Sequence, residues 1–384
     1  MPRRAFVIVM DACGAGALPD AAEYGDEGAN TLAHVAEAAG GLELPVMQRL
    51  GLGSALALRG CPPAEAPVVH GRLHPLGPGK DTVSGHWELM GVVTPVPLRT
   101  YPDGFPPQVT GELRAATGRG VLCNRPYSGT AVIDDFGEEQ LRTGDLIVYT
   151  SADSVLQIAA HVDVVPVDEL YAACRAAREI MTGEHAIGRV IARPFTGPAG
   201  AFERTDGRKD LALDPPGRSY MEELRADGIP VHTVGKVGSV FNHVGVDAEH
   251  PGATNAAAMA STSALIDDLD GGLVFTNLVE TDQVYGHRQD VPGFRRALQE
   301  IDATLGEWLG RLDPERDLLV ITADHGCDPT TPGTDHTREH APLLATFAGH
   351  GGRRHDGPLA DVGASALRWL AGRDAPELAG APFL

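Results

Sequence analysis

The chain has 384 residues, of which 43% are hydrophobic and 22% are charged. This composition is typical of globular enzymes and excludes a disordered chain, and the length favours two domains. The net charge of −21 argues against a general nucleic-acid-binding protein, and no stretch approaches the ~20 apolar residues of a membrane span.

Strand and helix patterns alternate along the first part of the chain, as they do in βα units. The apolar run at residues 6–11 is too short for a signal peptide and ends on Asp11, so it is predicted to be the first strand. A Gly-rich turn follows, and then a helix near residues 31–39.

The middle third has its own series of elements and predicts an inserted domain. Strands are expected at 146–151 and 189–193, with an amphipathic helix at 167–181 between them. Stretches rich in Pro and Gly, at about 95–107 and at 214–217, predict the two joints. The expected domains are therefore residues 1–96 and 217–384, which form one core, and residues 97–216, which form the insertion.

The last third resumes the first domain. Strands are predicted at 231–236, 273–282 and 318–325, and helices near 254–269 and 293–312. The whole pattern predicts an α/β fold with a mostly parallel sheet, helices on both faces, and a smaller inserted α/β domain.

Potential metal ligands occur at the ends of three predicted strands that are far apart in sequence. Each aspartate alone could be an ordinary surface carboxylate, but the carboxyl ends of parallel strands share one edge of a sheet. Mixed carboxylate and imidazole ligands in this number are what two adjacent divalent cations require, and both zinc and manganese fit. The six candidates are Asp11, Asp282, His287, Asp324, His325 and His336.

The segment 79–88 carries hydroxyl residues in a loop flanked by glycines. One of these hydroxyls could act as a nucleophile if a metal lowered its effective pKa. The alternative is a polar turn in which Thr82 or Ser84 caps a helix. The segment is not a phosphate-binding P-loop, because the required glycine spacing is absent.

Basic side chains are concentrated in the middle third of the chain, although the net charge of the whole chain is negative. Such a set suits a phosphorylated substrate, although solvated surface charge is the default interpretation for each member. Ser151 and Asp153 follow a predicted strand and could bind sugar hydroxyls or cap a helix. The basic residues are Arg189, Arg193, Arg204, Arg208 and Lys209, together with Lys236 on a core strand.

The five cysteines are odd in number and form no CxxC pair. This usage predicts reduced thiols in a cytoplasmic protein. Cys13 and Cys327 are close in sequence to candidate ligands, and we interpret both as bystanders.

Taken together, these motifs resemble those of the alkaline phosphatase superfamily and, within it, the phosphopentomutase family. The resemblance covers nearly the whole chain, and its most specific parts are the GHWE sequence at 85–88 and the long insertion. The motifs are Asp11, KDTxxGHWE at 80–88, TDx4H at 281–287, ADHG at 323–326, TDHT at 334–337, RVIARPF at 189–195 and VGK at 234–236.

This resemblance implies a site with two manganese ions and a threonine, Thr82, that is phosphorylated in the active enzyme. One ion would take Asp11, Asp324 and His325, and the other Asp282, His287 and His336. Substrate contacts would fall on Ser151, Asp153, Arg189, Ile191, Arg204 and Lys236.

The implied reaction interconverts α-D-ribose 1-phosphate and ribose 5-phosphate, and the deoxyribose pair, through a sugar bisphosphate. Glucose 1,6-bisphosphate or a pentose bisphosphate would activate the enzyme. A phosphatase or phosphodiesterase, a phosphoglycerate mutase, and a non-catalytic metal-binding protein are the alternatives. The expected partners are small sugar phosphates; the sequence does not determine the oligomeric state, and a monomer is the simplest expectation.

Overall fold

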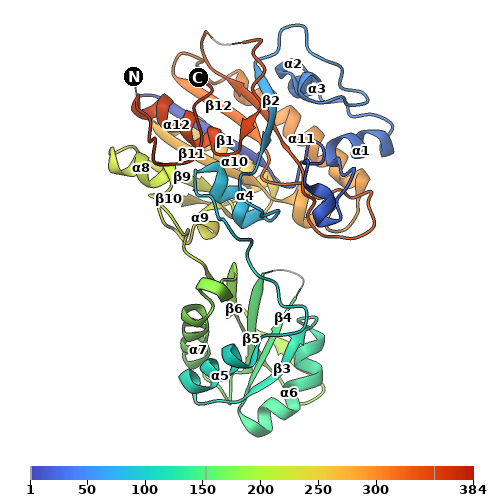
Figure 1. Ribbon diagram of the computed structural model, residues 1–384, viewed down its shortest axis with the longest axis vertical. Coiled ribbons are helices and arrows are strands. Elements are labelled where there is room, and N and C mark those ends of the chain that lie inside the picture. The colour runs from blue at the N-terminus through green and yellow to red at the C-terminus, as the bar shows by residue number, and fades with distance from the viewer. Residues whose placement is uncertain (1, 152–153, 350) are drawn as a thin grey trace. The chain divides into compact units, whose positions relative to one another are not determined.

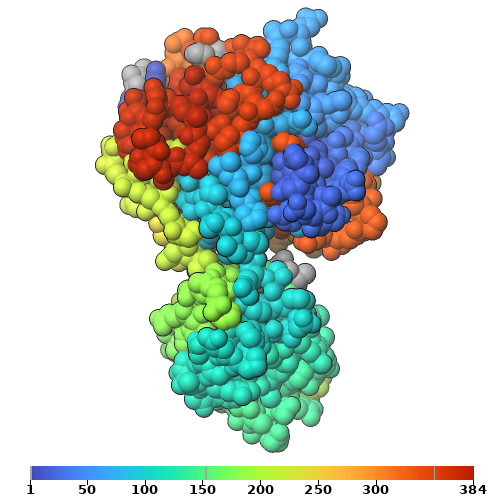
Figure 2. Space-filling model, in the orientation of Figure 1, coloured from blue at the N-terminus to red at the C-terminus, as the bar shows by residue number. Residues whose placement is uncertain are grey.

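The computed structural model describes residues 2–151, 154–349 and 351–384. The chain folds as two compact units, and the smaller one, Leu98–Asp214, is inserted between the two parts of the larger one. A proline lies on the larger-unit side of each joint, at Pro97 and Pro215. In the larger unit, segments from both ends of the chain lie side by side, blue and red in Figure 2.

An eight-stranded sheet forms the centre of the larger unit. The five strands from β10 through β12 in the order given below are parallel to one another, whereas β13 runs antiparallel to both of its neighbours, β12 and β2. Strands β1, β11 and β12 are buried along their whole length, which explains why they are almost continuously apolar. The order is β10 (Ala248–His250), β9 (Val231–Val234), β11 (Gly272–Leu278), β1 (Arg4–Met10), β12 (Asp317–Thr322), β13 (Ala341–Thr346), β2 (Val69–His74) and β14 (Gly357–Pro358).

Helices pack against this sheet in two layers. One layer contains α10 (Asn255–Asp268), α11 (Val291–Leu309), α1 (Thr31–Ala38) and α2 (Pro45–Leu50). The other contains α12 (Asp361–Ala371), α8 (Tyr220–Ala226), α4 (Thr82–Leu89) and α9 (Val237–Val240) (Figure 1). Three short helices complete the unit: α3 (Leu52–Ala55), the 3-10 helix Ala21–Tyr24 and the π-helix Thr281–Gly286. The predicted fold class is confirmed.

The inserted unit has its own sheet and hydrophobic core. Helices α5 (Pro107–Thr117) and α7 (Val167–Ile180) contribute to a large apolar cluster, and α6 (Ala131–Thr143) to a separate, smaller one. A 3-10 helix lies at Gly183–His185. The sheet order is β3 (Val121–Pro126), β4 (Leu146–Thr150), β5 (Val155–His161), β6 (Arg189–Thr196) and β7 (Glu203–Arg204), and β8 (Lys209–Ala212) also pairs with β6.

Several predicted strands end earlier than the sequence suggested. β11 ends at Leu278, so the prediction that this strand extends to Asp282 is wrong. The chain instead turns into the π-helix, in which the His287 amide donates to the Asp282 carbonyl at 3.1 Å. Lys236 likewise lies two residues beyond the end of β9. Within the described residues, no helix is both long enough and apolar enough to cross a membrane.

Candidate active site

The ends of β1, β11 and β12 lie side by side in the larger unit. Met10 pairs with Leu278, and Val9 pairs with Thr322, so the segments that follow these strands start at the same sheet edge. Ligand atoms of Asp11, Asp324 and His325 consequently all lie within 4.8 Å of one another. These three buried side chains form the first group that could hold a metal ion.

A second group lies next to the first, on the segment that follows β11 and on the loop around His336. Asp282 Oδ1 is 3.4 Å from His287 Nε2 and 3.3 Å from His336 Nε2. The two Nε2 atoms are 3.1 Å apart. The wider turn of the π-helix brings Asp282 and His287 together, and such turns are frequent at functional sites. His325 joins both groups, since it also lies within 4.8 Å of Asp282 and His336.

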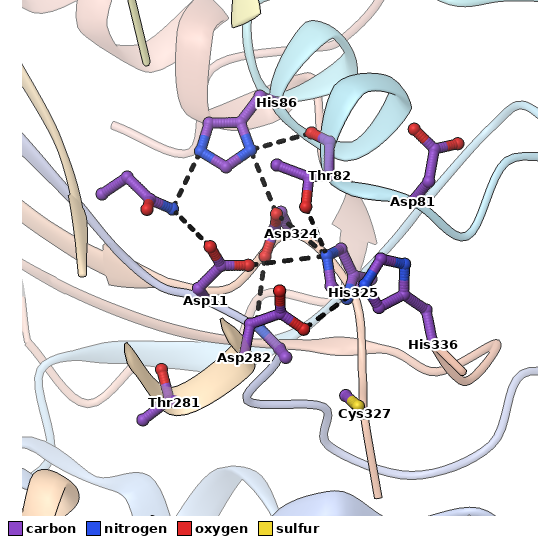
Figure 3. A network of polar contacts seen from close by, with 12 residues as sticks. Asp11, Asp81, Thr82, His86, Thr281, Asp282, Asp324, His325, Cys327 and His336 are labelled. Atoms are coloured by element: carbon purple, nitrogen blue, oxygen red, sulfur yellow. Dashed lines mark hydrogen bonds and ion pairs between the residues drawn. The ribbon is translucent and has the colours of Figure 1, made fainter. Parts of the chain in front are cut away.

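Thr82 is the first residue of α4, and its hydroxyl lies beside these groups. Asp81 is the helix N-cap and accepts from the amides of Val83 at 2.9 Å and Ser84 at 3.1 Å. The Thr82 hydroxyl is therefore not used as a cap. It lies 3.1 Å from His325 Nε2 (Figure 3) and 3.2 Å from Lys236 Nζ.

The charges of this site fit divalent cations. Asp11, Asp282 and Asp324 are at most 5% exposed, and each has one buried carboxylate oxygen that accepts no hydrogen bond from the residues that the structure describes. Buried carboxylates of this kind are costly unless positive charge compensates them. Hard oxygens combined with imidazole nitrogens suit manganese or zinc. The donor set therefore fits a metal site.

Burial shifts the pKa values of two residues in the first group, Asp11 and His325. Burial, followed by the charge of Asp324, raises the pKa of Asp11 well above its usual value. Burial lowers the pKa of His325 to about 4, so its imidazole is neutral at physiological pH. A neutral imidazole has the free lone pair that a metal ligand needs.

The residues expected to contact substrate belong to both units. Arg189 and Ile191 are on β6 and Arg204 is on β7, all in the inserted unit. Arg189 lies 3.8 Å from the Asp210 carboxylate, which also accepts from Arg208 at 2.7 Å. Ser151, directly after β4, is half-buried.

Lys236 differs from this set because it lies in the larger unit. Its ammonium contacts both Thr82 and the Asp11 carboxylate. Asp153 lies outside the described residues.

Cys327 lies directly beside the second group of candidate ligands. Its Sγ is 3.9 Å from His287 Nδ1, and it forms a possible ligand group with Asp282 and His287. Burial raises the pKa of its thiol, which disfavours the thiolate form that binds metals.

Two polar residues at the site received no role from the sequence. His86 contacts Asp324 and Asn277 contacts Asp11, although neither was named as a candidate. The signal for Asn277 was a single amide in the otherwise apolar strand β11. The signal for His86 was its place one helical turn after Thr82, which puts both on one face of a helix.

Comparisons with known proteins agree with this geometry. A family model described as the metalloenzyme superfamily matches residues 3–372. A phosphopentomutase of Anaeromyxobacter sp. (strain K) is 50% identical over 381 residues, which cover 97% of each chain. That of Caldanaerobacter subterraneus subsp. tengcongensis is 49% identical over 90% of this chain and 87% of its own.

The fold also has a match among solved structures. The PH0037 protein from Pyrococcus horikoshii aligns with a TM-score of 0.52 at 16% identity, over 98% of this chain and 99% of its own. At this level of identity the match concerns the fold alone.

Proposed function

Because the chain belongs to the phosphopentomutase family, we propose that it interconverts α-D-ribose 1-phosphate and D-ribose 5-phosphate, and the 2-deoxyribose pair, through a phosphorylated Thr82. The family makes it a metal-dependent isomerase that acts on sugar phosphates. The observation that supports the Thr82 mechanism is the position of its hydroxyl, 3.1 Å from His325 and 3.2 Å from Lys236, beside two groups of candidate ligands.

Two phosphoryl transfers at one threonine, within a single catalytic cycle, account for the reaction. The free sugar hydroxyl of the substrate attacks the phosphorus of phosphothreonine, and the bond from phosphorus to Thr82 Oγ1 breaks, which gives a sugar bisphosphate. The bisphosphate then reorients. Thr82 Oγ1 attacks the other phosphate and releases the isomerised sugar monophosphate, so that the enzyme ends the cycle phosphorylated.

The residues around Thr82 have distinct parts in this scheme. We assign Asp11, Asp324 and His325 to one manganese ion, and Asp282, His287 and His336 to the other. Two such ions stabilise negative charge on the attacking and leaving oxygens of a phosphoryl transfer. The Lys236 ammonium lies beside Thr82 Oγ1 and stabilises the negative charge that Thr82 Oγ1 carries during the transfer.

The inserted unit supplies recognition of the sugar phosphate in this proposal. Arg189 and Arg204 bind the phosphate that is not being transferred, and Ser151, Asp153 and Ile191 contact the sugar. A guanidinium can hold a phosphate by two parallel hydrogen bonds, which fixes the orientation of the ligand. We also assign Lys236 to substrate binding.

We place the enzyme in the cytoplasm, because its five free cysteines, of which four are buried, are typical of a reducing compartment. We also propose that it is a monomer. Its activation would require glucose 1,6-bisphosphate or a pentose bisphosphate to phosphorylate Thr82.

A product assay separates this proposal from hydrolysis at the same metals. Supplied with ribose 1-phosphate, the enzyme should produce ribose 5-phosphate and little inorganic phosphate. Release of inorganic phosphate faster than isomerisation would favour the phosphatase or phosphodiesterase alternative. Isomerisation of phosphoglycerate at a comparable rate would favour the phosphoglycerate mutase alternative.

Replacing Arg204 with Ala should raise KM for ribose 5-phosphate and lower kcat/KM about 10- to 100-fold, as expected from the loss of ~1.5–3 kcal/mol of charged hydrogen bonds. Arg204→Lys should recover only part of this loss, because an ammonium lacks the guanidinium fork. Steady-state kinetics with elemental analysis measure both effects, and metal content should stay unchanged.

Arg142→Ala is the matched control, since this arginine side chain is 72% exposed on α6 and pairs with Glu139 of the same helix. Its kinetics should equal those of the parent. Parental kinetics in both Arg204 variants would show that Arg204 does not bind the phosphate.

A further inference from the structure

The GHWE segment contains a buried histidine to which the proposed reaction assigns no step. His86 lies in α4, one turn after Thr82, and is fully buried against the Phe275 ring, with the ring centroids 5.7 Å apart. Its Nδ1 is 2.9 Å from the Thr82 carbonyl oxygen and 3.0 Å from Asp324 Oδ2 (Figure 3). One imidazole nitrogen thus contacts both the helix turn of the nucleophile and a candidate metal ligand.

The other nitrogen of His86 leads to a second candidate ligand. Asn277 Nδ2 is 3.2 Å from His86 Nε2 and 3.1 Å from Asp11 Oδ2. Asn277 is fully buried in β11, and it pairs with Val9 in the neighbouring strand β1, two residues before Asp11. The contacts therefore run from Asp11 through Asn277 and His86 to the backbone of Thr82.

The chemistry of these groups fixes the direction of each hydrogen bond. A carbonyl oxygen only accepts, so His86 Nδ1 carries the hydrogen and donates to Thr82. The amide of Asn277 must direct its nitrogen at Asp11, because its oxygen would face a carboxylate oxygen there. One N–H of this amide then donates to Asp11 and the other to His86 Nε2, which accepts.

We propose that His86 and Asn277 are positioning residues, which hold the start of α4 in register with the Asp11 and Asp324 carboxylates and so align Thr82 with the metal ligands. This inference rests on the proposed role of Thr82. Because the amide uses both of its N–H groups and the imidazole both of its nitrogens, a change in either residue removes contacts on both sides of it. The two residues should act as one unit.

The position of α4 does not depend on His86 and Asn277 alone. The neighbouring residues of α4 anchor the helix elsewhere: Trp87 Nε1 donates to the Val240 carbonyl at 3.0 Å, and Glu88 accepts from the Gly77 amide at 2.9 Å. Variants of His86 are therefore expected to fold, with α4 free to shift by the small amounts that matter for phosphoryl transfer.

The test compares His86→Leu, Asn277→Leu and the double variant. Partners of metal ligands typically contribute 10- to 100-fold to metal affinity or activity, so each single variant should lose about that factor in kcat, with KM for the sugar phosphate nearly unchanged. Mn²⁺ titration followed by electron paramagnetic resonance should show weaker binding by about tenfold. The double variant should lose no more than the worse single variant.

Two further variants separate positioning from a general loss of packing. His86→Asn keeps a donor at the place of Nδ1 and should recover part of kcat. Thr276→Val removes a different buried hydrogen bond of β11, the one of 2.8 Å to Thr262, and should leave Mn²⁺ affinity at the parental value.

The inference is overturned if His86→Leu keeps parental kcat and Mn²⁺ affinity, or if the two single losses multiply in the double variant. Its failure is distinguishable from failure of the proposed function. An active Thr82→Val variant would refute the proposed function, whereas inactive Thr82→Val with parental His86 variants would refute only the inference.

Discussion

Thr82→Val should eliminate isomerisation, with a loss of at least on the order of 10³-fold in kcat, because it removes the only atom that carries the phosphoryl group between the two half-reactions. Valine has nearly the volume of threonine, so the start of α4 should keep its structure. Incubating dephosphorylated parent enzyme with glucose 1,6-bisphosphate should restore activity and add one phosphate, which mass spectrometry should locate on Thr82. The variant should accept no phosphate under the same conditions.

Thr82→Ser is the matched control for this prediction, since it retains a hydroxyl at the same position. It should be phosphorylated by the bisphosphate and should keep part of the activity. Full isomerisation by Thr82→Val, or phosphate found on another residue of the active parent, would refute the assignment.

Asp324→Ala should remove both metal and turnover. Its carboxylate lies within 4.8 Å of the Asp11 and His325 ligand atoms, so its loss removes charge from the centre of the first group. Activity should fall by more than the roughly 100-fold typical of residues that only support a ligand. Elemental analysis should find two manganese ions per parent chain and fewer in the variant. Chelation should inactivate the parent, and Mn²⁺ should restore activity best.

Asp302→Asn controls for the loss of a buried carboxylate elsewhere. Asp302 is 2% exposed and accepts from the amides of Val46 and Met47, at the start of α2. This variant should unfold at lower temperature but keep both metal ions. One ion or none in active parent protein would contradict the two-metal proposal, as would parental metal content in Asp324→Ala.

The part of the site at the sheet edge could be predicted from the sequence, because its residues follow strands that a local pattern of apolar residues identifies. Apolar runs that end near Asp11 and Asp324 predict buried strands, and parallel strands bring their carboxyl ends together. The same rules predicted the βα order and, to within three residues at each end, the helices α1, α7, α10 and α11. Family resemblance, not periodicity, gave Thr82 its role.

Other features depend on contacts that no local pattern encodes. The π-helix after β11 is one example: the apolar run 273–279 suggested a longer strand, but the site requires a turn that brings Asp282 and His287 together. The hydrogen bonds of His86 with Asn277 are another, since they join residues 191 positions apart. His86 lies inside α4 and Asn277 inside β11, and the rule that parallel strands share an edge does not bring these two positions together.

The most direct test of the account follows one labelled phosphoryl group through a single turnover. Enzyme carrying radiolabelled phosphate on Thr82 is mixed with unlabelled ribose 5-phosphate, the reaction is stopped early, and the products are separated. The proposed mechanism predicts label first in a ribose bisphosphate and then in ribose 1-phosphate, while Thr82 takes the unlabelled 5-phosphate and little label enters inorganic phosphate. Label released directly as inorganic phosphate, or label retained on Thr82 while the substrate isomerises, would contradict it.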